Sequence, residues 1–381
     1  MSNVIKVILQ PRRTSIMIHP RILVTGATGK TGGAVVSQLR GRGVPVRAVV
    51  RRRDERSRAL ERQGIEVIVA DPMNAQQMRD VLQGVDRAYY LPPFHPSMLE
   101  AATIFASAAR DSGLESLVAL SQWLASPDHP AWLTRQLWHM EQLFGQLPGG
   151  STIIAPPFFA DNYLRLIGFA AHLGVLPSLT GDSRNAPPST EDIAAVAVAA
   201  LLDPGAHAGR HYCPTGPELL STADMAQVLG QVLDRRVRRL EMPMWLFLKA
   251  ARMQSVSPEE LSGFRYWVED HRQGAFAFNL PSGDVLHVTG RSPESFETAA
   301  RRYAALPEAR RGLRADAKAM ADFMRTPLSP GYDLNRFDRE RNLVAPTDAR
   351  FAMGNPEWRT ERTLQATSAE RGMHQIMGEA A

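Results

Sequence analysis

The chain has 381 residues, of which 44% are hydrophobic and 22% charged, with a formal net charge of +5 at pH 7. This composition is ordinary for a soluble globular protein of about two domains. The single cysteine, Cys213, excludes an intrachain disulfide framework and a multi-cysteine metal site. No apolar run approaches the ~18 residues of a membrane span, and the arginine runs lack the interleaved aromatics of a nucleic-acid platform. We therefore expect neither a membrane nor a nucleic acid as partner.

The first residues of the chain are basic and contain no acidic side chain, and a second methionine, Met17, precedes the first predicted strand. A signal peptide would have a longer apolar centre and a small-residue cleavage site. We interpret residues 1–19 as an N-terminal extension, with translation starting at Met1 or Met17, and expect a cytoplasmic protein.

Residues 20–160 alternate short β-branched runs with helical patterns, which predicts a parallel sheet with crossover helices. The expected strands are 22–24, 46–50, 66–69, 87–91, 116–120 and 152–155, and the expected helices are 31–40, 75–82, 98–110 and 134–144. The pattern therefore predicts an α/β fold with a doubly wound parallel sheet, that is, a Rossmann domain.

The rhythm changes after Pro156. We expect helices over 161–173, from Ser189 to Leu202 and from Ser221 to Leu233, with a short strand at 210–213. This is too irregular for a second doubly wound domain and predicts a smaller C-terminal α/β lobe over residues 161–306. Residues 307–381 are expected to be a C-terminal extension, partly extended or disordered. Removal of everything after Arg325 should then leave the fold intact.

The first predicted strand runs into a glycine-rich turn with the spacing G-x-x-G-x-x-G. The first glycine permits a tight turn, the second lets backbone amides approach a pyrophosphate, and the third lets helix and strand pack closely. A nucleoside-triphosphate loop would need a glycine at position 24, which is valine. The turn therefore predicts a dinucleotide site, with candidate residues Gly26, Thr28, Gly29, Lys30, Thr31 and Gly32.

The end of the second strand indicates which dinucleotide binds. Proteins that prefer NAD usually carry an acidic residue there, to hold the ribose 2′-hydroxyl. Here the first acidic residue of the chain is Asp54, and the strand ends in three arginines. Guanidinium groups suit a 2′-phosphate. We therefore predict NADP(H) as the cofactor, with Arg51 and Arg52 at the phosphate.

The remaining strand ends meet at the same edge of the sheet, where open α/β sheets bind ligands. They add further candidates for cofactor binding, namely Asp71, Pro92, Pro93, Ser121, Pro156 and Phe158.

With these residues in hand, the chain resembles the NmrA-like branch of the atypical short-chain dehydrogenases from about Arg21 to Tyr303. The similarity rests on the glycine turn and on segments 46–51, 64–71, 84–86, 156–163, 191–194 and 215–218. The resemblance implies NADP(H) binding, with substrate between the sheet edge and the small lobe. Members include NADPH-dependent reductases of quinones, azo dyes or triphenylmethane dyes, and nucleotide-sensing regulators that catalyse nothing.

The usual proton donors of such enzymes are missing. No tyrosine is followed four residues later by lysine. Relatives often carry lysine or histidine three residues after a threonine and four before a glutamate, but here Thr134 and Glu141 frame Leu137. His139 lies two residues further on, about 200° round a helix, so we expect it to face elsewhere.

The remaining catalytic candidates are Ser121, Asn162 and Tyr163, with Gln122 beside them. A hydroxyl or amide there could orient a carbonyl oxygen, although strand-end or helix-cap roles would explain the same residues. Three tryptophans could line an apolar pocket or belong to the core, namely Trp123, Trp132 and Trp138.

These features predict an NADPH-dependent oxidoreductase that reduces an apolar, quinone-like or dye-like acceptor. The alternative, favoured by Leu137, is a non-catalytic NADP(H)-sensing regulator that binds a protein partner. A nucleotide-sugar or isoflavonoid-type reductase is weakened by the missing lysine. The sequence leaves the oligomeric state open.

Overall fold

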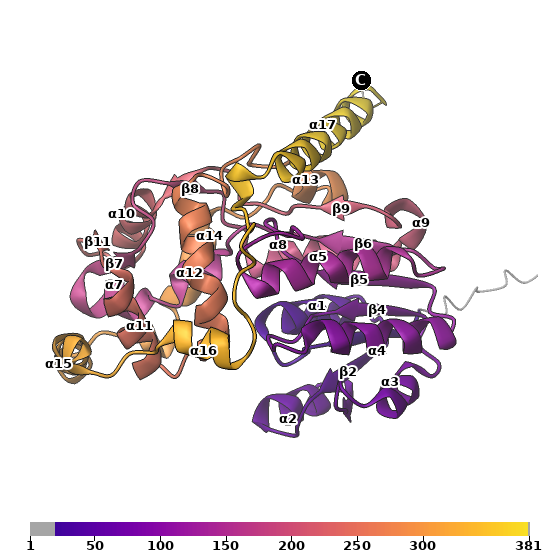
Figure 1. The fold of residues 1–381 in the computed structure, drawn as a ribbon, viewed down its shortest axis with the longest axis horizontal. Helices are drawn as coiled ribbons and strands as arrows, with labels where there is room; N and C mark the ends of the chain where they lie inside the picture. The colour runs from indigo at the N-terminus through magenta and orange to yellow at the C-terminus, as the bar shows by residue number, and fades with distance from the viewer. Residues whose placement is uncertain (1–19, 380–381) are drawn as a thin grey trace, which may run out of the picture.

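A seven-stranded parallel sheet forms the centre of the computed structural model, which describes residues 20–379, with side chains to residue 367 (Figure 1). The strand order is β3-β2-β1-β4-β5-β6-β9, and the predicted N-terminal extension lies outside the described residues. The strands are β1 (Ile22–Thr25), β2 (Val46–Val50), β3 (Glu66–Val69), β4 (Arg87–Tyr90), β5 (Ser116–Leu120), β6 (Ser151–Ile154) and β9 (His211–Tyr212). The chain reverses its winding between β1 and β4, which confirms the doubly wound class.

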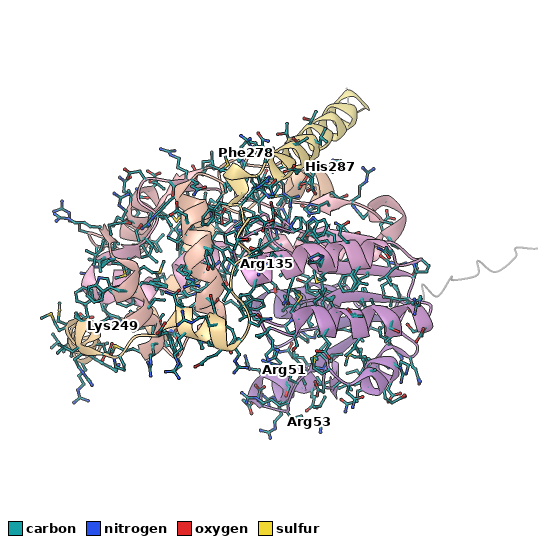
Figure 2. All side chains as sticks on the ribbon, viewed as in Figure 1. Arg51, Arg53, Arg135, Lys249, Phe278 and His287 are labelled. Atoms are coloured by element: carbon teal, nitrogen blue, oxygen red, sulfur yellow. The ribbon has the colours of Figure 1, made fainter. Side chains whose placement is uncertain are left out.

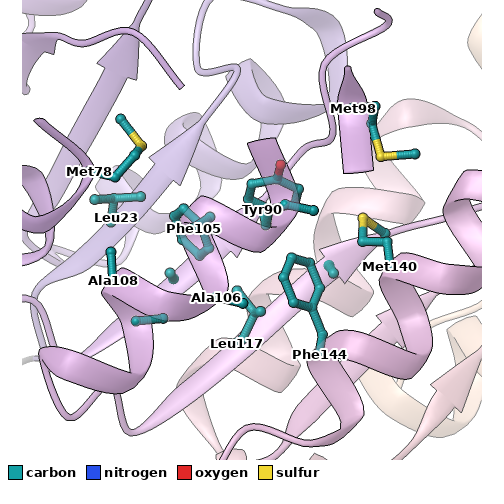
Figure 3. Close-up of a cluster of buried hydrophobic side chains, with 14 of the residues drawn as sticks. Leu23, Met78, Tyr90, Met98, Phe105, Ala106, Ala108, Leu117, Met140 and Phe144 are labelled. Carbon is teal, nitrogen blue, oxygen red and sulfur yellow. The ribbon is translucent and has the colours of Figure 1, made fainter. Parts of the chain in front are cut away.

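Three helices cover one face of this sheet, namely α3 (Ala75–Leu82), α4 (Met98–Asp111) and α5 (Trp132–Gly145). Apolar side chains from these helices pack on inward-facing sheet residues such as Leu23 and Leu117 (Figure 3). Tyr90 lies among the rings of Phe105 and Phe144, with centroids 4.7 and 5.1 Å away. Because successive strand residues point to opposite faces, Ile22 and Val24 belong to a second cluster on the other side.

The opposite face is covered by α1 (Lys30–Gly41), α8 (Thr190–Leu202) and α13 (Asp284–Thr289). Helix α8 begins after Ser189, as expected, and the Ser189 side chain accepts a hydrogen bond from the Asp192 amide at 3.0 Å. However, α8 and β9 follow residue 160, where we placed the end of the Rossmann domain. A sheet buried on both faces needs a second layer of helices, and this chain supplies part of that layer from its later sequence. The structure therefore interleaves the two predicted domains.

The smaller lobe lies beside the carboxyl ends of the strands (Figure 1). It contains a parallel pair of strands, β7 (Val175–Ser178) and β11 (Arg238–Glu241), and an antiparallel pair, β8 (Arg184–Asn185) and β10 (Leu220–Ser221). Its helices are α6 (Ala160–Leu164), α7 (Ile167–Leu173), α10 (Thr222–Val232), α11 (Met244–Met253), α12 (Pro258–Arg272) and α14 (Phe296–Ala304). The helix that we expected over 161–173 is thus two helices. The sequence reading also missed α2 (Glu55–Arg62) and placed no helix at α11 or α12.

The C-terminal extension contradicts our expectation of an extended or disordered tail. It forms α15 (Leu313–Arg325), α16 (Leu334–Glu340) and α17 (Pro356–Glu379). Trp358 is 2% exposed and Arg362 is 0% exposed, and both donate hydrogen bonds to the Trp123 carbonyl, at 3.1 and 3.0 Å. The reason is long-range packing: the extension runs back over the Rossmann domain and buries a few large side chains among many polar ones. None of the helices in the described part of the chain has the length and hydropathy of a membrane span.

Candidate functional site

The glycine turn joins β1 to α1 in the geometry that the spacing predicted. Gly26 has a φ of +62°, in the left-handed region that favours glycine, and its carbonyl accepts the Gly29 amide at 2.8 Å. A Cβ on Gly32 would lie 2.3 Å from the Gly26 carbonyl oxygen, so only glycine lets helix and strand approach this closely. Gly29 has no side chain to cap α1, which leaves the first turn of the helix suited to an anion. These residues fit a dinucleotide pyrophosphate.

Lys30, at the start of α1, connects the turn to the smaller lobe. Its Nζ lies 2.9 Å from Asp161 Oδ2 on α6 and 2.6 Å from the Tyr303 hydroxyl on α14. Tyr303 in turn donates to Asp161 Oδ2 at 2.6 Å, and burial and this carboxylate raise the pKa of Tyr303. The ion pair brings the predicted cofactor turn directly against the helix that carries Asn162.

Arginines surround the end of β2. The side chains of Arg51 and Arg52 are exposed and form no hydrogen bond or ion pair with the side chains that the structure describes, those of residues 20–367. Arg53 Nη2, in contrast, lies 3.1 Å from Glu61 (Figure 2). Arg56 on α2 was missed by the sequence analysis. Its guanidinium donates to the Thr28 carbonyl at 3.5 Å, which places Arg56 beside the turn. The sequence analysis did not predict α2, the helix that carries this arginine.

The other predicted cofactor residues lie along the same edge. The Asp71 carboxylate accepts the Met73 amide at 2.9 Å and so closes the turn after β3. Pro92 and Pro93 are half-buried after β4, and the carbonyl of buried Pro156 accepts the Trp123 amide at 3.1 Å. The structure thus brings the strand-end candidates to one edge. Their contacts with a cofactor remain a prediction.

Ser121 is buried at the end of β5, and its hydroxyl donates a short hydrogen bond to Glu141 on α5. The second carboxylate oxygen of Glu141 lies 3.7 Å from His211 Nε2. Leu137, at the position where relatives often carry lysine, is also buried. The Glu141 carboxylate thus already has a hydrogen-bond partner in Ser121. Exposed His139 faces away from this group, as its place on the helix predicted.

Tyr163 lies in a closed hydrogen-bond network rather than presenting a free hydroxyl. Its hydroxyl is 2.8 Å from His271 Nε2 and accepts from Asn185 Nδ2 at 3.3 Å, while His271 Nδ1 is 2.7 Å from Ser183 Oγ. Burial raises the pKa of Tyr163 and lowers the pKa of His271 to about 4. At neutral pH His271 is therefore uncharged and Tyr163 holds its proton. The catalytic role of Tyr163 stays a prediction.

A mostly apolar cavity of about 340 Å³ begins at Phe158 and Asn162, immediately after β6. It extends into the smaller lobe as far as Phe323 and Pro327 of the C-terminal extension. Two of the predicted catalytic residues line it, buried Tyr163 and half-buried Asn162. The Asn162 Oδ1 accepts a hydrogen bond from Arg165 at 3.3 Å. A cavity of this size is typical of small-molecule sites.

The three tryptophans considered as pocket residues belong to the packing of the protein instead. Trp123 is buried against Trp358, with ring centroids 5.8 Å apart; Trp132 is buried and Trp138 half-buried, and none of the three lines the cavity. Trp132 does contact Phe94, an exposed ring that follows β4 and also meets Trp267 of α12, with centroids 6.4 and 6.1 Å away. Sequence patterns did not single out this aromatic group, because its members come from three separate segments.

The fold and site define the class: a doubly wound α/β protein with a dinucleotide-type turn and an apolar cavity at one edge of its sheet. The model of the NmrA-like family matches residues 19–275. The chain belongs to this family.

Curated relatives support that assignment, and a solved structure has the same fold. NAD(P)H azoreductase of Xenophilus azovorans is 29% identical over 290 residues, which cover 74% of this chain and 98% of that protein. The (4-alkanoyl-5-oxo-2,5-dihydrofuran-3-yl)methyl phosphate reductase of Streptomyces griseus is 33% identical over 279 residues, covering 72% and 95%. The crystal structure of an NADPH-dependent quinone oxidoreductase from Escherichia coli, complexed with NADPH, is similar with a TM-score of 0.63 at 22% identity, covering 74% and 99%.

Proposed function

We propose that this protein is an NADPH-dependent reductase of an apolar, quinone-like or azo-dye-like acceptor. The observation that carries the proposal is the Lys30–Asp161 ion pair of 2.9 Å, which joins the start of the glycine turn to α6. On that same helix, Asn162 lines the apolar cavity. A cofactor on the turn and an acceptor in the cavity would therefore meet at one sheet edge. The reductase activity of the azoreductase relative supports the same conclusion.

The glycine turn would hold the pyrophosphate through backbone amides at the start of α1. Arg51 and Arg52 would bind the 2′-phosphate of NADP(H), since both are exposed and no described side chain pairs with their guanidinium groups. Arg56, beside the Thr28 carbonyl, is a third candidate. Bound NADPH would supply the hydride, while the protein orients the acceptor and excludes water.

The hydrogen bonds around the edge indicate which acceptors suit the site. Ser121 donates to Glu141 and Tyr163 is held by His271, so neither hydroxyl is poised to donate a proton to substrate. General acid catalysis is typically worth ~10²–10⁴-fold, and an ordinary ketone needs it because an alkoxide would otherwise form. A quinone or an azo group stabilises added negative charge and can take its proton from water. The Asn162 amide would then orient the acceptor.

Consumption of NADPH tests this proposal, measured over a panel of quinones, azo dyes and simple ketones with identification of the products. We expect turnover of quinones or azo dyes and much slower reduction of ketones. Fast reduction of simple ketones would contradict the proposed mechanism. Tight NADPH binding without turnover of any acceptor would replace the proposal with the second candidate, a redox-sensing regulator, which the buried Leu137 favours.

A further inference from the structure

We propose that the acceptor is amphiphilic, with a reducible head at Asn162 and a hydrocarbon tail that lies in the cavity against the C-terminal extension. This inference rests on the proposed function, because it names the class of acceptor for the same site. Under this proposal, residues 323–327 form part of the binding site, although they lie outside the segment that the family model covers.

The cavity is long enough to hold both a head group and a tail. Its lining joins Phe158 and Asn162, directly after β6, to Phe323 and Met324 on α15. Between them the wall includes Phe264, which stacks on Phe247 with ring centroids 4.9 Å apart and planes 22° apart. A compact head group would occupy only the inner end, which leaves the apolar remainder for a tail.

The charged groups of the lining, and the hydroxyl groups of its serine and threonines, have partners within the protein. Arg165 and Glu260 are the charged residues among the described lining residues, and they pair with each other at 2.8 Å. Thr222 Oγ1 lies 3.4 Å from Ser178 Oγ and 3.2 Å from Thr180 Oγ1. A charged tail would find no free partner here, and a hydrocarbon chain would leave no buried polar group unsatisfied. The lining therefore favours an uncharged apolar chain.

The outer wall is held in place by specific contacts between the extension and the smaller lobe. His172 Nδ1 lies 2.7 Å from Asp316 on α15, and Lys249 Nζ donates to the Pro327 carbonyl at 2.5 Å (Figure 2). Residues after 275 lie outside the family model, and about a quarter of the chain has no counterpart in the azoreductase relative. The wall at 323–327 thus lies outside the segment that the family model covers and is positioned by contacts of its own.

The outer end remains open to solvent. Met324 is 67% exposed although it lines the cavity, and Leu328 beyond it is also exposed. A tail longer than the cavity could therefore leave past these side chains without displacing the core. This geometry fits acceptors with a variable chain length.

Two benzoquinones that share one head test the inference: 2,3-dimethoxy-5-methyl-1,4-benzoquinone without a tail and the same quinone with a decyl tail. Binding is measured by calorimetry with the cofactor absent and with NADP⁺, and kcat/KM is measured with NADPH. Each buried methylene contributes roughly fourfold in affinity. Burial of two or three methylenes predicts that the decyl quinone binds about 10- to 60-fold more tightly.

Met324→Glu places a charge in the wall, and Met320→Glu is the matched control, because Met320 lies on the same helix, is 50% exposed and does not line the cavity. We expect Met324→Glu to weaken the decyl quinone at least tenfold and to leave the tailless quinone unchanged, and Met320→Glu to change neither. Equal affinity for both quinones, or equal effects of the two variants, would overturn the inference. Tail-dependent binding without NADPH oxidation would instead reject the proposed reductase and keep the tail site.

Discussion

The extension should stabilise the whole protein through Trp358. This side chain is 2% exposed, contacts the rings of Trp123 and Phe278 with centroids 5.8 and 5.6 Å away, and donates its indole N–H to the Trp123 carbonyl at 3.1 Å. Truncation of a buried tryptophan to alanine costs about 3–5 kcal/mol. At roughly 2–4 °C per kcal/mol, Trp358→Ala should lower the melting temperature by about 6–20 °C.

Thermal unfolding followed by circular dichroism measures this loss. Trp245→Ala is the matched control, since Trp245 is 54% exposed on α11, and exposed substitutions usually change stability by less than ~0.5 kcal/mol. If Trp358→Ala unfolds at the same temperature as the parent protein, the extension does not pack as described. A drop of similar size in the Trp245 variant would show that any loss of an indole has this effect.

Three further predictions follow from the site. Gly32→Ala should weaken NADPH binding at least tenfold in a fluorescence titration, because the added Cβ would lie 2.3 Å from the Gly26 carbonyl oxygen. The control is Gly41→Ala on the same helix, where an added Cβ meets no atom within 4 Å, and this variant should bind NADPH normally. His139→Ala should change kcat less than tenfold, because the loss of a general acid typically costs at least ~10²-fold. A larger loss would indicate that His139 donates a proton to the substrate. His271 has its pKa lowered from 6.5 to about 4, so the unfolded chain binds its proton first. Stability should therefore fall as pH falls from 6.5 to 4, by at most about 3 kcal/mol from this group, and urea unfolding of His271→Gln should show a weaker dependence.

The Rossmann sheet could be predicted because each of its strands is a local pattern. The strands 46–50, 66–69 and 116–120 have the expected bounds, since β-branched runs flanked by turns carry their own signal. The glycine turn was equally local, and its close approach of Gly32 to Gly26 follows from the spacing alone. Helix α8 was also foreseen as a helix, but its pattern does not tell which sheet it covers.

The features that the sequence did not reveal depend on residues far apart in the chain. Trp358 finds its partner Trp123 235 residues earlier, and the extension that carries it is rich in charged residues, which is also the composition of a disordered tail. The cavity is similar, since its lining joins Phe158 to Phe323. The hydrogen bond between the Tyr163 hydroxyl and His271, 108 residues later, could not be foreseen for the same reason.

Titration of the protein with NADPH and with NADH tests the central claim most directly, in the parent protein and in Arg51→Glu. A charge-assisted hydrogen bond to the 2′-phosphate contributes roughly 1.5–3 kcal/mol, so the parent should bind NADPH about 10- to 100-fold more tightly than NADH. Arg51→Glu should remove that preference and leave NADH binding nearly unchanged. Equal affinity of the parent protein for the two dinucleotides, or no binding of either, would contradict the account.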